Sequence, residues 1–280
     1  WYKTPRAQGG VQVLDVVYLM VLAVVQGVTE FLPISSSGHL VLVPLFMDVP
    51  DQGLMLDVAV HVGTLFAVII YFSRDVWGMF TGLAGLLRGR KTPGGRLLGM
   101  LMVGTIPVTA VGFALNQYYP DGFRGLEVIG WTTLGFGLLL LITDQLGMTL
   151  RRIEHLRISD AAVIGIVQAL ALIPGTSRSG ICITAARMMG MERQDAARFA
   201  MLLGIPAIAG AGVLKGYELW KIGDARLTLD VFIAGGLSMV VALIAIALMM
   251  VWLRRATFTI FAVYRLLLSG FLLVVAYGYA

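Results

Sequence analysis

The sequence predicts an all-α integral membrane protein with six transmembrane helices plus two opposed re-entrant helical hairpins, arranged as an inverted-topology repeat. Three observations predict this fold. The chain is 58% apolar and only 13% charged, whereas about 25% of the residues in a soluble domain are charged. It contains six apolar stretches of the length that crosses a bilayer, about 20 residues. Two further apolar stretches are each interrupted by a proline and a run of small polar residues.

Composition also excludes several classes of protein. So few charges rule out a cytosolic enzyme, a disordered chain and a nucleic-acid-binding domain, so we expect no nucleic acid as a partner. The one cysteine, Cys182, rules out an intramolecular disulfide. The net charge of +5 says less about partners than the placement of the charges does.

Six stretches predict simple spans. Their ends lie near charged or turn-forming residues such as Ser73-Arg74-Asp75, and several tryptophans lie near these ends, as interfacial aromatic residues do. The predicted spans are 54–72, 98–115, 127–146, 199–219, 231–252 and 258–278.

The interrupted stretches, 11–46 and 160–190, predict the two re-entrant hairpins. In each, a helical run ends close to a proline, Pro33 or Pro174, which removes a backbone donor and clashes with the preceding turn. The Ser- and Gly-rich segment that follows is too polar to face lipid, so it must be buried in protein or line a wet cavity.

The two interruptions resemble each other. Gly38 aligns with Gly180 and Gln26 with Gln168, roughly half the chain length apart. Each interruption precedes three spans, so residues 1–280 form a single membrane domain of two repeats, 11–146 and 160–278. An odd number of crossings per repeat inverts one against the other, and the hairpin tips then meet near the midplane.

The distribution of Lys and Arg predicts the orientation. Most of them fall on one side, which the positive-inside rule makes cytoplasmic, and we count Arg187 and Arg265 on that side. Both termini and the first hairpin's entrance are then outside. We interpret the basic connections as topology signals rather than as sites for lipid head groups.

Gln26 and Glu30 are four residues apart and share one face of a helix. A carboxylate at membrane depth is costly and favours a functional role. The alternative is a carboxylate that reaches the interface or bonds nearby hydroxyl groups.

Ser35, Ser36, Ser37, Gly38 and His39 open a new short helix. Free amide groups and the helix dipole at such a start suit an anion. Simple N-capping is the alternative, but it needs one serine and does not explain the histidine. Beside a buried carboxylate, serine and histidine are the residue types of nucleophilic and acid–base catalysis, although a lone histidine is as often a satisfied polar group.

The second interruption supplies Thr176, Ser177, Arg178 and Ser179. A guanidinium inside a membrane requires an anionic partner, and its planar fork suits phosphate. A structural ion pair with Glu30 is the alternative, but the surrounding hydroxyl groups favour phosphate. Together the two tips predict a phosphate site suited to phosphoryl transfer from a lipid.

Other polar residues look structural. We expect Asp57 and His61 to be a helix-start carboxylate and a packed histidine. Asp144 is expected at the membrane interface, and Tyr264-Arg265 is expected to anchor the last span. The sequence has no zinc-ligand spacing, P-loop or dinucleotide fingerprint.

The segments Gln26-Gly-Val-Thr-Glu-Phe-Leu-Pro-Ile-Ser-Ser-Ser-Gly-His39 and Pro174-Gly-Thr-Ser-Arg-Ser-Gly180 resemble the two signature motifs of the undecaprenyl-diphosphate phosphatase family, of the bacitracin-resistance type. The resemblance covers nearly the whole chain, including 57–65 and 261–265. It implies an enzyme of the bacterial inner (plasma) membrane that hydrolyses undecaprenyl diphosphate to undecaprenyl phosphate and phosphate, recycling the carrier for peptidoglycan synthesis. It also implies a polyprenyl diphosphate substrate, Mg²⁺ or Ca²⁺, and a site that opens on the periplasmic side.

The resemblance assigns roles by position. Glu30 matches the essential carboxylate, Ser36 the favoured nucleophile, His39 the motif histidine and Arg178 the essential arginine. Gln26 stands where the family has Glu or Gln, so Glu30 and Gln26 are the metal candidates with one carboxylate between them. The residues implied to bind phosphate are Ser35, Ser37, Gly38, Thr176, Ser177, Arg178 and Ser179.

Several alternatives stay open from the sequence. The base for Ser36 is either His39 or Glu30, and direct attack by water competes with attack by Ser36. A polyprenyl-phosphate transporter or flippase has the same inverted-repeat architecture. A type-2 lipid phosphate phosphatase is excluded because Thr184 stands where that family needs its histidine nucleophile, and a non-catalytic lipid-binding protein leaves the buried charges unexplained. Formation of a homodimer, the preferred metal and the prenyl chain length are also open.

Overall fold

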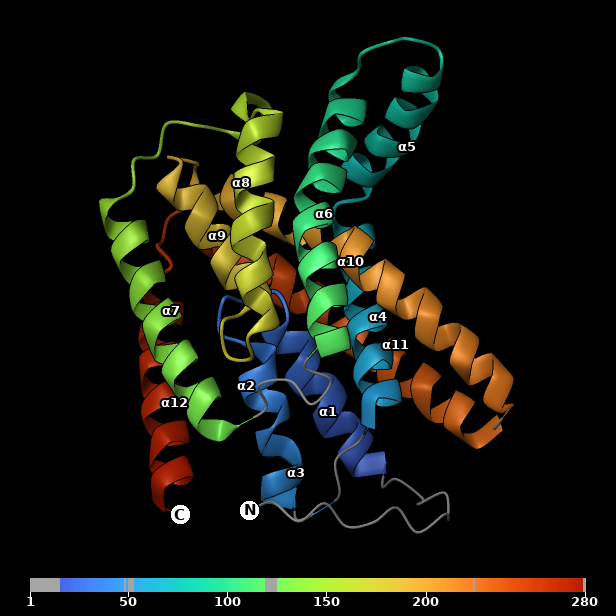
Figure 1. The fold of residues 1–280 in the computed structure, drawn as a ribbon, viewed down its shortest axis with the longest axis vertical. Helices are drawn as coiled ribbons and strands as arrows, with labels where there is room; N and C mark the ends of the chain where they lie inside the picture. Colours follow the sequence, from blue (N-terminus) through green and yellow to red (C-terminus); the bar gives the residue numbers. More distant parts are fainter. Residues whose placement is uncertain (1–15, 48, 50–52, 119–124, 224, 279–280) are drawn as a thin grey trace.

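The computed structural model describes residues 16–47, 49, 53–118, 125–223 and 225–278, and this part of the chain is almost entirely helical (Figure 1). No strand occurs in these ranges; Arg151 and Met191 form an isolated β-bridge. The long helices are α4 (Gly53–Tyr71), α6 (Pro93–Tyr118), α7 (Leu126–Leu146), α10 (Arg193–Ile222), α11 (Ala225–Trp252) and α12 (Thr259–Gly278). Each covers one of the six predicted spans.

Five helices in the described ranges are long and apolar enough to cross a membrane: α6, α7, α10, α11 and α12. A sixth is reached by counting α4 together with α5 (Ser73–Leu87), to which it is bent by 84°. The chain therefore has the helices of a multi-pass membrane protein. The sequence did not predict α5, because charged residues at its start and frequent glycines hide the apolar pattern.

Two shorter helical hairpins lie among the long helices. The first consists of α1 (Val16–Thr29), a break, α2 (Ser36–Leu40) and α3 (Leu42–Met47). The second consists of α8 (Ile158–Gln168), the 3₁₀ turn η2 (Ala169–Leu172), a break and α9 (Arg178–Met188). Both breaks fall at the predicted prolines. The ends of the first hairpin lie at the lower end of Figure 1, those of the second lie at the upper end, and the tips meet at mid-height.

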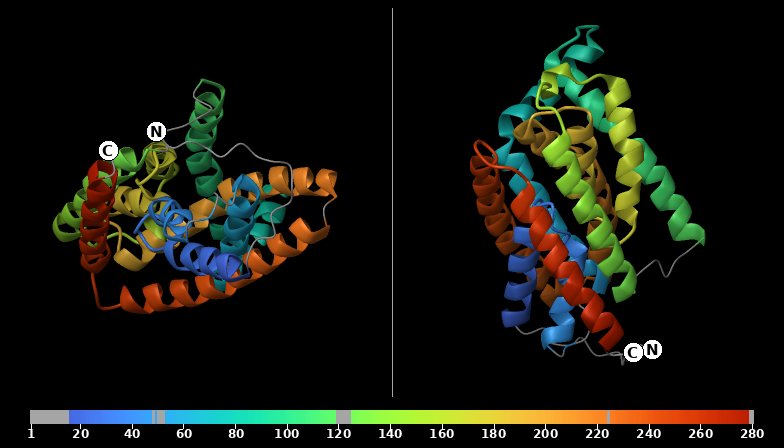
Figure 2. Two further views of the ribbon diagram at one scale, coloured as in Figure 1. Left: turned by 90° about the horizontal axis from the view of Figure 1, so that it is seen from below. Right: turned by 90° about the vertical axis from the view of Figure 1, so that its left-hand side faces the viewer.

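The second hairpin lies in the core. All residues of α9 from Ser179 to Arg187 are buried, and a large cluster of apolar side chains joins this helix to the start of α10. The first hairpin packs through α1 on α11, and α7 and α12 run side by side, as the right-hand view of Figure 2 shows. Burial from several directions therefore holds both tips in place.

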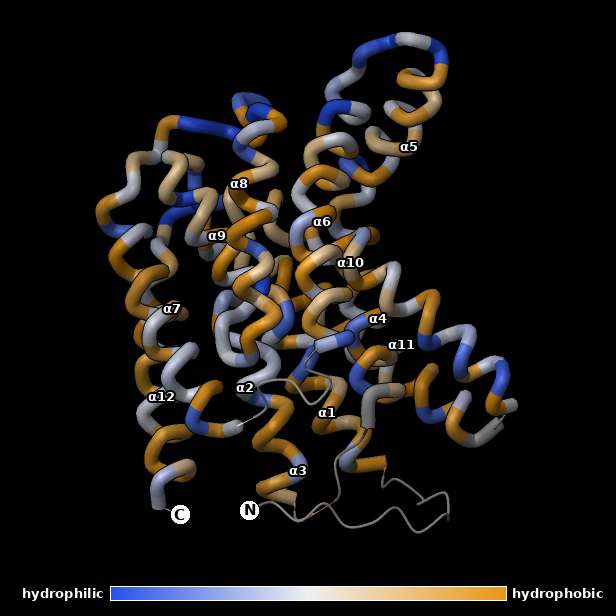
Figure 3. Tube along the Cα trace, in the orientation of Figure 1, coloured by the Kyte–Doolittle hydropathy of each residue, from blue (hydrophilic) through white to orange (hydrophobic). Residues whose placement is uncertain are grey.

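Hydropathy along the chain follows this arrangement. Figure 3 shows apolar residues over most of the long helices and hydrophilic residues at the α5–α6 and α7–α8 connections. Hydrophilic residues appear again at mid-height, where the hairpin tips meet. The polar segments are enclosed by helices rather than exposed to the apolar surroundings, as a membrane requires.

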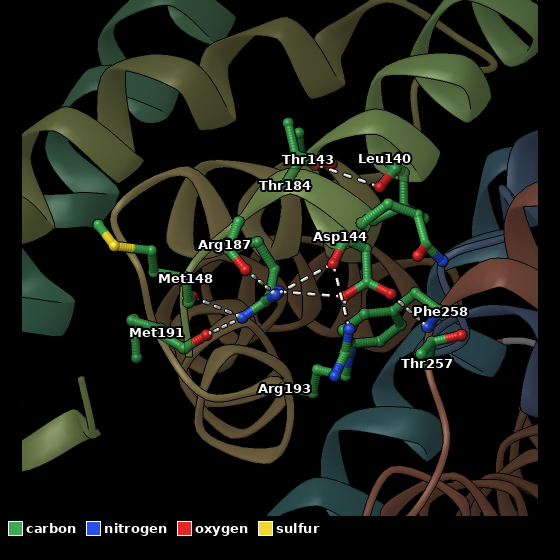
Figure 4. Close-up of polar contacts among 12 residues, drawn as sticks. Leu140, Thr143, Asp144, Met148, Thr184, Arg187, Met191, Arg193, Thr257 and Phe258 are labelled. Carbon is green, nitrogen blue, oxygen red and sulfur yellow. Dashed lines mark hydrogen bonds and ion pairs between the residues drawn. The ribbon is translucent and has the colours of Figure 1, made fainter. Parts of the chain in front are cut away.

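Asp144 lies near the end of α7, and its surroundings are those of a buried ion pair. Its side chain at the end of α7 is completely buried, and Oδ1 pairs with Arg187 Nε at 3.0 Å and with Arg193 Nε at 2.8 Å. Its Oδ2 accepts the backbone N–H of Phe258 at 2.8 Å. Figure 4 shows both arginines converging on this carboxylate. The cluster ties α7, α9, α10 and the start of α12 together, which anchors the base of the second hairpin.

Candidate active site

Each hairpin tip contains a serine with an unusual backbone. Ser35 has φ 73° and Ser177 has φ 68°, the two positive φ values found at non-glycine residues of the described ranges. Each immediately precedes the second helix of its hairpin, and its hydroxyl lies 3.2 Å from the hydroxyl of the serine two residues later, Ser37 or Ser179. The two tips therefore have equivalent local geometry. Ser36 of the first tip occupies the position of Arg178 in the second.

The tips contact each other directly. The backbone N–H of Gly175 donates to Ser37 Oγ at 3.1 Å. Ser179 Oγ donates to the backbone carbonyls of Glu30 and Leu32, each at 3.2 Å. Gly175 has φ +91°, and an added Cβ there would lie 2.1 Å from Thr132 Oγ1, so this close approach requires glycine. The predicted meeting of the two interruptions is confirmed.

Glu30 is the centre of this contact. Arg178 Nη2 lies 3.0 Å from Oε1, and Oε2 accepts hydrogen bonds from Gln26 Nε2 at 2.9 Å and from Ser36 Oγ at 3.1 Å. The predicted shared face of Gln26 and Glu30 is thus confirmed, and Glu30 is only 7% exposed. Arg178 thus forms the ion pair with Glu30 that the sequence left as an alternative.

Arg178 is held in a narrow space. Its Nη1 lies 3.4 Å from the backbone carbonyl of Ala200, and its Cζ lies 6.0 Å from the centroid of the Phe31 ring. An added Cβ at Gly204 would lie 2.0 Å from Nη1. Gly204 therefore creates the room for the guanidinium, and the sequence carried no signal for this role.

Both ring nitrogens of His39 form hydrogen bonds. Nδ1 donates to the backbone carbonyl of Ser35 at 2.7 Å, so in the neutral ring Nε2 accepts from the Tyr264 hydroxyl, also at 2.7 Å. The two rings are nearly parallel, with 4° between their planes. His39 is thus tied to the strained turn before Ser36, whereas the Ser36 hydroxyl bonds to Glu30. Tyr264 belongs to the site instead of anchoring a span.

His61 also lies at the site, which the sequence analysis missed. Its Nδ1 donates to the backbone carbonyl of Asp57 at 2.6 Å, and its Nε2 lies 3.4 Å from Glu30 Oε2. This contact with the α4 backbone orients the ring toward Glu30. The signal was the position of His61 inside a segment that resembles the family, 57–65.

Arg265 was wrongly expected to anchor the last span on the cytoplasmic side. Its side chain is completely buried, and Nη2 donates to the carbonyls of Gly175 and Thr176, each at 3.0 Å. Nε lies 3.3 Å from the carbonyl of Thr133. The backbone carbonyls freed by the helix break are therefore bound by a cation from α12, and this need was not visible in the periodicity of the sequence.

The polar residues of the tips differ in exposure. Ser37 is exposed, Ser36 and His39 are partly exposed, and the Arg178 side chain is 17% exposed. Ser35, Gly38, Thr176, Ser177 and Ser179 are buried, the hydroxyl of Ser177 accepting the backbone N–H of Gly180 at 3.2 Å. The first group is accessible at the surface of the described structure. The second group shapes the backbone behind it, and the Thr176 hydroxyl has no partner within the described ranges.

These residues do not fit a divalent ion held by the protein alone. Mg²⁺ and Ca²⁺ take several oxygen ligands, but the described part of the chain gathers no three His, Cys, Asp or Glu side chains at one point. Both oxygens of Glu30 already face N–H or O–H donors. Gln26 Oε1 is buried without a partner in the described structure, which adds one neutral oxygen to one carboxylate.

Comparisons with known proteins identify a family and several relatives of this chain. The family model described as "Bacitracin resistance protein BacA" matches residues 19–271. The chain is 48% identical over 266 residues to Undecaprenyl-diphosphatase 1 of Rhodospirillum rubrum, covering 92% of this chain and 94% of that protein. It is 50% identical over 262 residues to the Undecaprenyl-diphosphatase of a Jannaschia species, covering 93% and 98% of the two chains, and 44% identical over 260 residues to that of Hahella chejuensis, covering 92% and 97%.

Proposed function

The chain belongs to the bacitracin resistance protein BacA family, and on that premise we propose that it is an undecaprenyl-diphosphate phosphatase. It hydrolyses undecaprenyl diphosphate to undecaprenyl phosphate and inorganic phosphate, which returns the lipid carrier to peptidoglycan synthesis. One observation carries the chemical assignment. The hydroxyl of Ser36 donates to a carboxylate, Glu30, that an arginine from the other hairpin holds in place.

The membrane arrangement is part of the proposal. The two hairpins are re-entrant and enter from opposite faces, between six spans arranged as inverted repeats, 11–146 and 160–278. Support comes from the matching turns at Ser35 and Ser177 and from the meeting of the tips at mid-height. The connections rich in Lys and Arg lie at the end opposite the start of α1 and the end of α12, so we assign both termini and the entrance to the site to the periplasmic side. Removing Arg265 from the count does not change this assignment.

Binding of the diphosphate uses the cationic side of the site. Arg178 and the amide groups at the start of α9 hold the phosphate oxygens. Ser36 and Ser37 border the same opening and donate from their hydroxyl groups. When the head group binds, Arg178 exchanges part of its contact with Glu30 for the phosphate, and Glu30 remains bonded to Ser36.

Ser36 Oγ attacks the terminal phosphorus in line, and its proton passes to Glu30. The bond from that phosphorus to the bridging oxygen breaks, and undecaprenyl phosphate leaves with the electron pair. Water then attacks the phosphoserine, which releases inorganic phosphate and restores the Ser36 hydroxyl. Glu30 is the base in this scheme because Ser36 bonds to it, while both nitrogens of His39 are bonded elsewhere. His39 orients the turn that carries Ser36.

A divalent ion, Mg²⁺ or Ca²⁺, belongs to the proposed function through the family resemblance. Such an ion supplies positive charge to the phosphate oxygens. The sequence predicted Glu30 and Gln26 as its protein contacts, but they offer one carboxylate and one neutral oxygen, which is too few to hold the ion alone.

Phosphate release by the purified protein in detergent tests the function. We expect Mg²⁺-dependent release of phosphate from undecaprenyl diphosphate, and none when both Glu30 and Arg178 are replaced by Gln. A flippase without phosphatase activity would release no phosphate, and that result would replace the proposed function with the transport alternative.

A further inference from the structure

We propose that the residues around Glu30 form no divalent-ion site by themselves and that Mg²⁺ or Ca²⁺ enters this site only on the substrate's diphosphate. This inference rests on the proposed function and concerns the same site. It follows from the charges and donors around Glu30, where residue 26 is Gln and residue 61 is His.

The first argument is the net charge of the protein groups at the site. Glu30 contributes one negative charge, and Arg178 Nη2, 3.0 Å away, cancels it. His61 Nε2 faces the same carboxylate at 3.4 Å and adds either no charge or a second positive one. The group of Glu30, Arg178 and His61 is therefore neutral or positive, and a dication placed there gains no net attraction. When the group is positive it repels a dication, and burial makes that repulsion stronger than it would be in water.

The second argument is the set of donors around the carboxylate. Oε2 accepts from Gln26 Nε2 at 2.9 Å and from Ser36 Oγ at 3.1 Å, while Oε1 faces Arg178. An ion on Oε2 would displace the contact that activates Ser36. Mg²⁺ in phosphoryl-transfer sites usually takes one or two carboxylates plus substrate phosphates, so the missing ligands here must come from the substrate.

A bound diphosphate changes both the net charge of the site and the set of ligands available to the ion. Its negative oxygens pair with Arg178, make the site negative overall and supply several hard oxygen ligands. The ion–diphosphate complex is then the species that the site recognises. By thermodynamic linkage, the ion must raise the affinity for diphosphate by the same factor by which diphosphate raises the affinity for the ion.

Titration with Mn²⁺ tests the inference without measuring activity. Free Mn²⁺ is followed by its electron paramagnetic resonance signal, with wild-type protein in a non-ionic detergent. We expect no saturable binding to the protein alone up to about 1 mM Mn²⁺. With a prenyl methylenediphosphonate, whose P–C–P bridge resists hydrolysis, we expect one bound Mn²⁺ per chain. Its affinity should exceed that of the diphosphonate in empty micelles by at least about tenfold.

Two glutamine variants test the stated reason. Gln26→Glu adds a second carboxylate beside Glu30 and should create Mn²⁺ binding in the absence of diphosphonate. Gln168→Glu adds one at the matching position of the second half, where the buried Gln168 donates to the carbonyl of Gly104, and should not. Thermal denaturation of each variant shows that it is folded. If Gln26→Glu folds and binds no Mn²⁺, the charge argument is wrong.

A saturable Mn²⁺ site in the wild-type protein alone that is lost in Glu30→Gln overturns the inference. A saturable site that Glu30→Gln retains lies elsewhere on the chain and leaves the residues around Glu30 without an ion, as proposed. Failure of the proposed function gives a different result. No phosphate release from undecaprenyl diphosphate with Mg²⁺ present counts against the proposed function. Phosphate release together with an Mn²⁺ site in the protein alone that Glu30→Gln abolishes counts against the inference alone.

Discussion

Arg178 Nη2 lies 3.0 Å from Glu30 Oε1, although 148 residues separate them in the chain. The ion pair leaves Oε2 facing Ser36 at 3.1 Å. Arg178 of the second hairpin thus occupies one oxygen of Glu30 and leaves the other oxygen to Ser36 of the first hairpin.

Replacing Glu30 by Gln keeps the shape of the side chain but removes the proposed base, so kcat should fall by about 10²–10⁴-fold. A phosphate-release assay measures kcat, and a Glu30→Gln variant that keeps wild-type kcat would exclude Glu30 as the base.

Ser36→Ala separates attack by serine from attack by water. If Ser36 is the nucleophile, kcat should fall at least about a thousandfold, because no other group replaces its oxygen. Activity within about threefold of wild type, roughly 0.7 kcal/mol of barrier, would instead support direct attack by water. Ser37→Ala is the neighbouring control. It loses the contact with the Gly175 N–H and should cost about tenfold or less, as one hydrogen bond does.

Gly204→Ala should disable the site without unfolding the protein. The added Cβ would lie 2.0 Å from Arg178 Nη1, which is the flexible end of a side chain. The guanidinium must therefore shift, and kcat/KM should fall by at least about tenfold, since small misplacements of binding groups are expensive.

Gly210→Ala is the matched control on the same helix, because an added Cβ there meets nothing within 4 Å. It should keep wild-type kcat/KM and gain up to about 1 kcal/mol in helix stability. Equal loss of activity in both variants would mean that helix α10, not Arg178, responds to the substitution.

Tyr264 and His39 should act as a unit. Tyr264→Phe removes the hydroxyl that bonds to His39 Nε2, and His39→Gln removes the ring that holds the carbonyl of Ser35. We expect each single variant to lower kcat and the double variant to be no worse than the poorer single one. A double-mutant cycle in kcat measures this coupling, and strictly multiplicative losses would show that the two residues work separately.

Asp144→Asn should lower stability more than activity at the site. The substitution leaves the buried Arg187 without its charged partner, and breaking a buried ion pair costs about 3–5 kcal/mol. The thermal midpoint in detergent should drop clearly. Glu192→Gln, which breaks the exposed pair with Arg152, should change the midpoint little. A wild-type midpoint for Asp144→Asn would show that Asp144 does not anchor the second hairpin.

The sequence was sufficient for much of the fold. Long apolar runs predicted all the long helices, and the breaks at Pro33 and Pro174 were predicted because proline and clustered small polar residues act locally. The bend between α4 and α5 was missed. It arises around Phe72, where helix α5 turns to pack on α6, and such tertiary contacts leave no periodic signal.

The site was predicted only in part, again because tertiary contacts leave no signal in the sequence. Glu30 stands out as a carboxylate in an apolar run, and Ser36 and Arg178 lie in polar runs of an apolar chain. His61 and Arg265 come from helices with ordinary apolar periodicity, and Gly204 acts only by lacking a side chain. Their roles depend on which helix faces the hairpin tips, so the folded structure was needed to find them.

Ser35 and Ser177 hold left-handed backbones that glycine would adopt with less strain, a penalty of order 1–3 kcal/mol at each tip. The surrounding helices sustain that penalty before any head group arrives. Under the proposed function, the backbones on either side of the site are therefore preorganised, and little of the affinity for the lipid is consumed in ordering the two turns.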